Sequence, residues 1–203
     1  MKIWTWIAIA VGFSGTISCG GSTPQTREAA PSASAETSPV AIPPPAKTHP
    51  VPAKLQEVAA QFGITMKDDW QWTELERMRT RFDWSGRPEG RAFEARWSFW
   101  LKGEDVRTMK PFLPAAVQSA ALNLTRSSAC DPFEQPAELA RMVGADRVIT
   151  VCFEPAPYVT EEFRHGVLHG LVRGDVLVIV IVLANDRTGT VPLPDHIGGR
   201  FSP

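Results

Sequence analysis

The segment FRHGVLHGLVRGDVLVIVIVLA, residues 163–184, decides the fold. Its two halves, Phe163 to Val172 and Val176 to Leu183, are rich in apolar and β-branched residues, and Arg173-Gly174-Asp175 separates them. Gly-Asp between two such runs is typical of a tight hairpin turn. The second run is apolar on both faces of a strand, which favours a central position in a sheet, and it is about half as long as a bilayer span.

Two further segments read as strands. Residues 91–102 alternate between an apolar face that includes Trp97 and a polar face that includes Trp100, which is the pattern of an amphipathic strand. Residues 147–153 are apolar and β-branched, so they predict a third strand directly before the hairpin.

Four segments predict helices. Apolar residues recur at helical spacing in 54–62, with Gly63 behind them, and again from Pro114 to Leu124. Thr73 to Glu76 has the form of a capping box, which predicts a helix running to about Arg81. Asp131 and Pro132 are typical of a cap and first helical position, and they predict a helix that ends before Gly144.

Strands and helices are partly segregated along the chain. The prediction is an α+β domain over residues 54–203, with an antiparallel sheet of about four strands and helices mainly on one face.

The N-terminus has the form of a signal peptide. One positive charge at Lys2 precedes an apolar run from Ile3 to Ile17, and the run ends at Ser18-Cys19-Gly20. These residues resemble the lipobox of bacterial lipoproteins, except that Thr16 stands where Leu is usual. The resemblance implies a signal peptide over 1–18, a diacylglyceryl (palmitate-type) lipid on Cys19 and an anchor in the cell envelope, at the outer membrane facing the periplasm. An ordinary secretory signal cut at another small residue is the alternative.

A tether is expected between the lipid and the domain, over residues 19–53. Eight of the 34 residues from Gly20 to Ala53 are Pro and seven are Ala. Such composition favours an extended chain of about 3.1 Å per residue without a core of its own.

The overall composition limits the classes of molecule that the protein is expected to bind. The 203 residues include 21 Lys and Arg against 22 Asp and Glu, which leaves a formal net charge of -1. This balance argues against a nucleic-acid binder, whose surface would be strongly basic. No cofactor-binding or phosphate-binding motif is found in the sequence, so no cofactor is predicted.

Cys130 and Cys152 are left as a pair if Cys19 carries lipid. An envelope location is oxidising, and the sequence therefore predicts a disulfide between them. Two buried thiols too far apart to bond are the alternative.

Glu161, His165 and His169 recur every four residues, which on a helix would gather them as metal ligands. The local residues favour a strand instead, on which positions four apart lie about 13 Å from each other. A metal or general-base site here is therefore the less favoured interpretation.

Five Trp residues fall between positions 70 and 100. Trp97 is expected in the core, and Trp100, on the polar face, is the candidate for stacking on a sugar ring or anchoring a partner protein.

These features favour a lipid-anchored envelope protein whose domain binds a partner protein or an envelope glycan without catalysis. A tethered periplasmic metal-dependent hydrolase and a structural or assembly lipoprotein of an envelope complex are the alternatives.

Overall fold

The computed structural model describes residues 50–77, 81–186 and 193–203. They lie within one compact unit that spans Pro44–Pro203. The predicted signal peptide, Cys19 and nearly all of the predicted tether lie outside the described residues. Val51 is already buried in the core, so the folded part includes residues just before the predicted boundary at residue 54.

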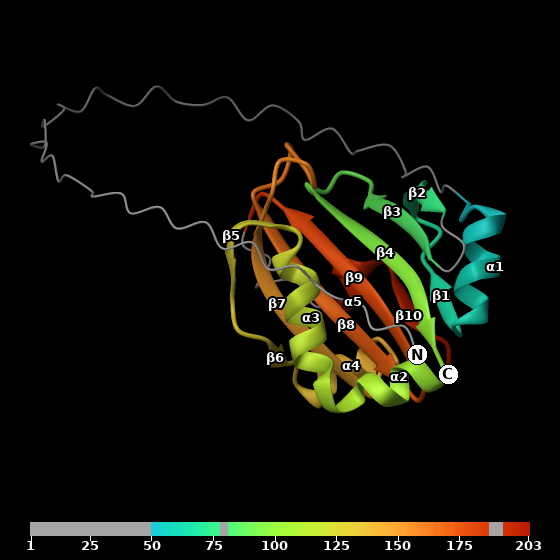
Figure 1. Cartoon of the computed structure of the whole chain (residues 1–203). Helices are drawn as coiled ribbons and strands as arrows, with labels where there is room; N and C mark the ends of the chain where they lie inside the picture. The colour runs from blue at the N-terminus through green and yellow to red at the C-terminus, as the bar shows by residue number, and fades with distance from the viewer. Residues whose placement is uncertain (1–49, 78–80, 187–192) are drawn as a thin grey trace, which may run out of the picture. The chain divides into compact units, whose positions relative to one another are not determined.

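One large antiparallel sheet organises the domain (Figure 1). Its strands run in the spatial order β2-β3-β4-β9-β8-β7-β5, and β6 adds to β7 beside β5. The bounds are β2 Trp70–Arg77, β3 Phe82–Pro88, β4 Phe93–Lys102, β5 Thr125–Ala129, β6 Phe133–Glu134, β7 Arg147–Pro155, β8 His165–Arg173 and β9 Val176–Ala184. A separate pair joins β1 Ile64–Met66 to β10 Gly199–Phe201.

The predicted hairpin and both further strands are confirmed as β8, β9, β4 and β7. The turn between β8 and β9 contains Gly174 at φ 56°, in the left-handed region that favours glycine. The α+β class and the antiparallel sheet are therefore correct.

The prediction of about four strands is wrong, because the sheet has eight. The capping-box interpretation of Thr73 to Glu76 accounts for part of the error. These residues lie in β2, where Thr73 pairs with Ser85 and Glu74 with Trp84 of β3. Pairing with a neighbouring strand outweighs a local capping signal.

The helices are α1 Ala53–Gln61, α2 Glu104–Met109, α3 Leu113–Leu122, α4 Ala137–Met142 and α5 Leu193–Ile197, with a 3-10 turn over Lys110–Phe112. The helix expected from Asp131 is much shorter than predicted. Its first residues form β6, and α4 begins only after Pro136.

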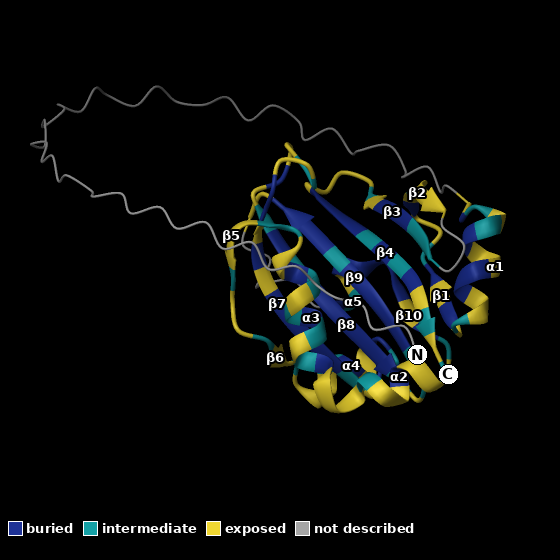
Figure 2. Ribbon diagram, viewed as in Figure 1, coloured by how far each residue is buried: buried dark blue, intermediate teal, exposed yellow. Residues whose placement is uncertain are grey.

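Helices cover both faces of the sheet, so the prediction that they lie mainly on one face is wrong. The alternating side chains of β9 show this: Val178, Val180 and Val182 pack in one core with α1, α4 and α5. Leu177, Ile179 and Leu183, on the opposite face of β9, pack in a second core with α2 and α3. Figure 2 shows the resulting burial along β8 and β9.

The C-terminal segment closes the first core. Leu193 and Ile197 of α5 are buried, and the Trp97 indole N–H donates to the Ile197 carbonyl at 2.6 Å. Trp97 has no exposed surface, which confirms its predicted place in the core.

Among the described residues, every helix is too short or too polar to cross a bilayer.

Candidate binding groove

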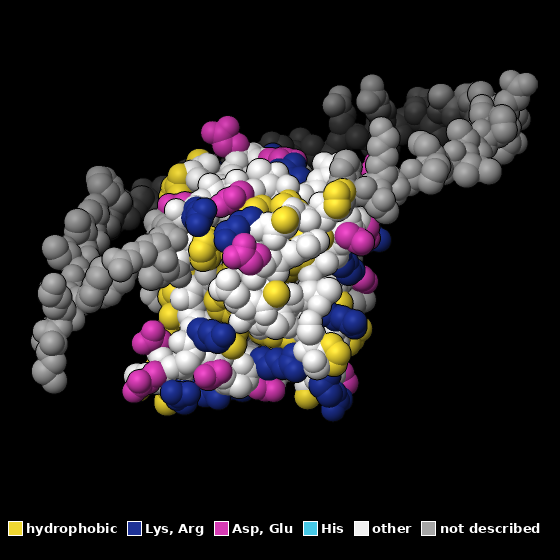
Figure 3. Space-filling view, turned by 90° about the vertical axis from the view of Figure 1, so that its right-hand side faces the viewer, with side chains coloured by type: hydrophobic (Ala, Val, Ile, Leu, Met, Phe, Trp, Pro, Cys, Tyr) yellow, Lys and Arg dark blue, Asp and Glu magenta, His cyan; other side chains and the backbone are white. Residues whose placement is uncertain are grey.

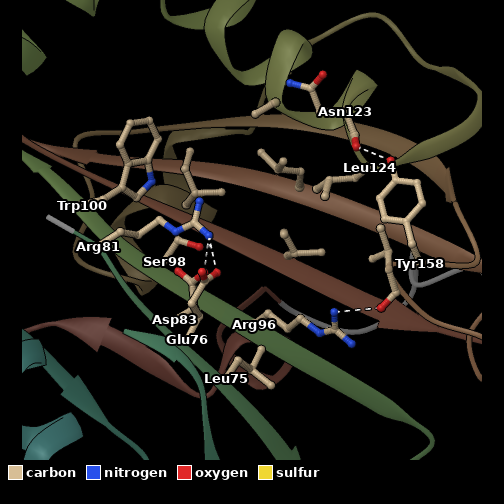
Figure 4. Close-up of a pocket in the computed structure, with 15 residues that line it drawn as sticks. Leu75, Glu76, Arg81, Asp83, Arg96, Ser98, Trp100, Asn123, Leu124 and Tyr158 are labelled. Carbon is tan, nitrogen blue, oxygen red and sulfur yellow. Dashed lines mark hydrogen bonds and ion pairs between the residues drawn. The ribbon is translucent and has the colours of Figure 1, made fainter. Parts of the chain in front are cut away.

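A groove of about 770 Å³ lies on the α3 face of the sheet (Figure 4). Helix α3 packs against β5, β7 and β8, and side chains of β2, β3 and β4 line the groove beside it. Leu168, Ile179 and Ile181 of β8 and β9 line the groove, as do Ala120 and Leu124 at the end of α3. The groove therefore combines an apolar surface with the polar side chains of β2, β3 and β4.

The sheet register brings these polar side chains together. Arg96 of β4 pairs with Ile181 of β9, and Ser98 with Ile179. Asp83 of β3 lies opposite Ser98. Because residues paired across adjacent strands share a face, these polar groups lie beside the apolar part of the groove.

Trp100 lies at one side of the groove. It is the extra residue of a β-bulge in β4, since the register with β9 shifts between Phe99 and Leu101. The side chain is 37% exposed. The prediction that Trp100 is a surface residue is confirmed, while its role in binding stays a prediction.

Tyr158 lies on the opposite side of the groove and is 74% exposed (Figure 4). Its hydroxyl donates to the Asn123 carbonyl at 2.5 Å, which ties the loop before β8 to the end of α3. Arg96 ties the same loop to β4, because its guanidinium donates to the Val159 carbonyl at 2.9 Å.

Ion pairs form the polar wall. The guanidinium of Arg81 lies 2.9 Å from the Glu76 carboxylate and 2.8 Å from that of Asp83. Burial raises the pKa of Asp83 above its usual value, and this effect outweighs the attraction of Arg81. The wall therefore offers several hydrogen-bonding groups whose charges largely cancel.

Glu94, which lies two residues before Arg96 on the same face of β4, anchors a second network. Its side chain is 4% exposed, and it accepts from Arg87 at 2.6 Å and from Arg96 at 2.6 Å. Burial alone would raise the pKa of Glu94, but the hydrogen bonds and charge of Arg96, with help from Ser85 and Arg87, hold it below its usual value. Arg87 also pairs with Glu162 of the loop at 2.7 Å.

The three residues of the less favoured metal site, Glu161, His165 and His169, do not lie together in the structure. His165 and His169 lie on a strand, β8, and His169 is buried while Glu161 is exposed in the preceding loop. Glu161 lines a surface hollow with Arg164, whereas both histidines line a different cavity. No group of three or more metal-binding side chains occurs within the described ranges.

The cysteines are brought together but are not bonded. Cys130 and Cys152 are free and stand 3.8 Å apart. The Cys130 amide donates to the Cys152 carbonyl at 2.8 Å, and the Cys152 amide donates to the Cys130 sulfur at 2.9 Å. Burial, together with Cys130, raises the pKa of the Cys152 thiol to about 11. The predicted disulfide stays a prediction, now with its two residues adjacent.

Tyr158, Arg81 and Asp83 were not among the predicted site residues. A signal for Asp83 exists in the alternation of Phe82, Asp83, Trp84 and Ser85, which is typical of a half-buried strand. Nothing local marks Tyr158, because its place depends on the packing of a loop against α3.

Charges of both signs are interspersed on the face shown in Figure 3. That face therefore lacks the single-sign field that would steer a strongly charged partner.

Comparisons of the chain with models of protein families, with curated proteins and with solved structures find no match.

Proposed function

We propose that this chain is a lipid-anchored protein of the bacterial cell envelope whose folded domain binds an envelope glycan, without catalysis, in the groove beside α3. The observation that carries the proposal is the combination of Trp100 and Tyr158, exposed on opposite sides of one groove, with a wall of paired charges between them.

This combination suits a saccharide. Aromatic faces and the apolar part of the groove accept the C–H faces of sugar rings, and Tyr and Trp present rigid rings at low entropic cost. The paired wall of Arg81, Glu76 and Asp83 offers donors and acceptors to hydroxyl groups without a large net charge. A highly charged ligand would find little electrostatic gain there.

The membrane anchor rests on the sequence. The apolar run ending at Cys19 supports lipidation, and the Pro- and Ala-rich residues after it support a spacer that holds the domain away from the membrane. The intact mass of the protein from native membranes tests this part. A chain that starts at Cys19 with added acyl mass is expected, and an unlipidated chain would remove the anchor.

Co-sedimentation with purified peptidoglycan sacculi tests the glycan. We expect the soluble chain from Gly20 onward to pellet with sacculi, and Trp100→Ala to weaken this binding about tenfold or more, because a buried aromatic contact is commonly worth more than 1 kcal/mol.

Phe112→Ala is the matched control. Phe112 is an aromatic residue with 68% exposure that does not line the groove, so its removal should leave binding unchanged. Circular dichroism confirms that both variants fold. Equal binding by both variants would contradict the proposal, and chemical crosslinking from Trp100 to an envelope protein would favour a protein partner instead.

A further inference from the structure

A second cavity, of about 490 Å³, lies on the other face of the sheet. Its surface is mostly apolar and includes Phe133, Val167, Val182 and Leu193. Cavities of this size commonly hold small organic ligands. The glycan groove and this cavity are lined by different residues, so the cavity requires an explanation of its own.

A series of hydrogen-bonded polar side chains ends in this cavity. The Gln135 amide donates to the Thr150 hydroxyl oxygen at 3.0 Å, and this oxygen lies 2.9 Å from Nδ1 of His169. Thr150 and His169 are directly paired across β7 and β8, which fixes their separation. Because the Thr150 hydroxyl accepts from Gln135, we assign its own hydrogen to Nδ1, and this assignment places the imidazole proton on Nε2.

His169 is the unusual member of this hydrogen-bonded series. It is only 4% exposed, and among the described residues its Nε2 has no hydrogen-bond partner. The same ring lines the cavity. Because the ring reaches the cavity surface, a ligand oxygen there would accept the hydrogen on Nε2.

The side chains that line the cavity include three histidines but no Lys, Arg, Asp or Glu. Burial, followed by the nearby His196, lowers the pKa of His169 to about 3, so the ring is neutral at physiological pH. His196 is itself 5% exposed, and burial lowers its pKa as well. An anion would have to leave water without meeting a cation, which disfavours charged ligands.

We propose that this cavity binds an uncharged, mainly apolar small molecule that carries one hydroxyl or carbonyl oxygen, and that Nε2 of His169 donates a hydrogen bond to this oxygen. The site is independent of the glycan groove.

Two probes of equal shape test the proposal on the soluble chain from Gly20 onward. 1-Naphthol carries the required oxygen, and in 1-methylnaphthalene a methyl group replaces it. We expect both to bind, with 1-naphthol preferred about tenfold, since one buried hydrogen bond contributes about 1.4 kcal/mol. Fluorescence titration gives both dissociation constants.

Variants locate the binding. His169→Phe keeps a ring but removes Nε2, so the preference for 1-naphthol should disappear while 1-methylnaphthalene still binds. Val167→Trp places a large side chain at a partly exposed position of the cavity wall and should abolish binding of both probes, which keeps the test valid if His169→Phe fails to fold.

Ile181→Trp is the matched control. Ile181 is also partly exposed and lies on the adjacent strand, but it lines the glycan groove. This variant should bind both probes like the wild type. Failure of the wild type to bind either probe, or unchanged binding by Val167→Trp, would overturn the proposal. Neither result bears on binding to sacculi.

Discussion

The two hollows of this domain lie on opposite faces of one sheet and differ in chemistry. The glycan groove is lined by ionised side chains paired with one another, such as Arg81 with Asp83. The histidine cavity, lined by His169 and His196, is built from polar groups that stay neutral. Because the two hollows are similarly open, the difference follows from the side chains that line them: paired ions in the groove, and buried imidazoles with lowered pKa values in the cavity.

Strand alternation produces both environments. On β4, Arg96 and Ser98 face the groove while Trp97 and Phe99 face the core that contains α5. On β8 the polarity of the two faces is reversed, because the apolar Leu168 faces the groove and the polar His169 faces the cavity. Neighbouring residues of one strand therefore face different sites, and a shift of the strand by one residue would exchange them.

The largest expected effect concerns the wall of the histidine cavity. Oxidation of Cys130 and Cys152 by oxidised glutathione should join them through thiol–disulfide exchange, with two equivalents of reduced glutathione released. Closing a loop of about 22 residues should raise the free energy of unfolding by about 3 kcal/mol, because the unfolded chain loses entropy. Urea unfolding of the oxidised and reduced forms measures this difference.

The double variant Cys130→Ser, Cys152→Ser should show no response to the oxidant. Thiol titration that still finds two free thiols in the treated wild type would contradict the predicted disulfide.

Acid should destabilise the folded domain through His169, which lines the histidine cavity. The pKa of His169 is about 3 in the folded protein against 6.5 for an ordinary His, so below pH 6.5 only the unfolded state takes up the proton. Stability from this residue is therefore full above pH 6.5 and falls by about 1.4 kcal/mol per pH unit down to pH 3.

Unfolding free energies at pH 7.5 and 4.5 should thus differ by about 2.7 kcal/mol through His169 alone. His196, beside Asp195 and Arg91, adds to the same slope because its pKa is also lowered. His169→Phe should reduce the slope, and an equal slope in the variant would contradict a buried neutral imidazole.

Removal of the buried carboxylate tests the groove side. Glu94→Gln keeps the shape of the side chain but leaves Arg96 without an anion and Arg87 with only the exposed Glu162, so we expect a loss of about 2 kcal/mol in unfolding free energy. Glu162→Gln removes an exposed partner of Arg87 and should cost less than about 0.5 kcal/mol. Equal losses in the two variants would show that Glu94 does not hold the network.

The smallest effect is expected in the loop before β8, which carries Tyr158. Tyr158→Phe removes the hydrogen bond to the Asn123 carbonyl but keeps the ring, so stability should fall by about 1 kcal/mol or less. Affinity for sacculi should fall a few-fold, because the ring loses its fixed position. A loss as large as that of Trp100→Ala would instead assign the hydroxyl a direct contact with the glycan.

Local patterns predicted the elements that their own residues determine. The hairpin of β8 and β9, the alternation of β4 and the helical spacing of α3 are all visible in sequence, and so is the surface position of Trp100. The helix expected at Thr73 shows the limit, since pairing with β3 decides that segment.

The sites themselves depend on contacts between distant segments. Thr150 and His169 are 19 residues apart, and only strand pairing makes them neighbours. Arg96 and Val159 are 63 residues apart. The cysteines are the exception, because the predicted signal peptide, and the oxidising compartment that it would imply, suggested their pairing without any knowledge of the fold.

Nuclear magnetic resonance of the soluble, isotope-labelled domain tests the central claim most directly. Muramidase-released peptidoglycan fragments are added, and backbone amide shifts are followed on both faces of the sheet. Glycan binding in the groove predicts saturable shifts at 81–83, 96–100 and 158–159, with 133–135 and 193–196, which line only the histidine cavity, unchanged. Absence of shifts at the first three segments, or shifts confined to the histidine cavity, would contradict the account.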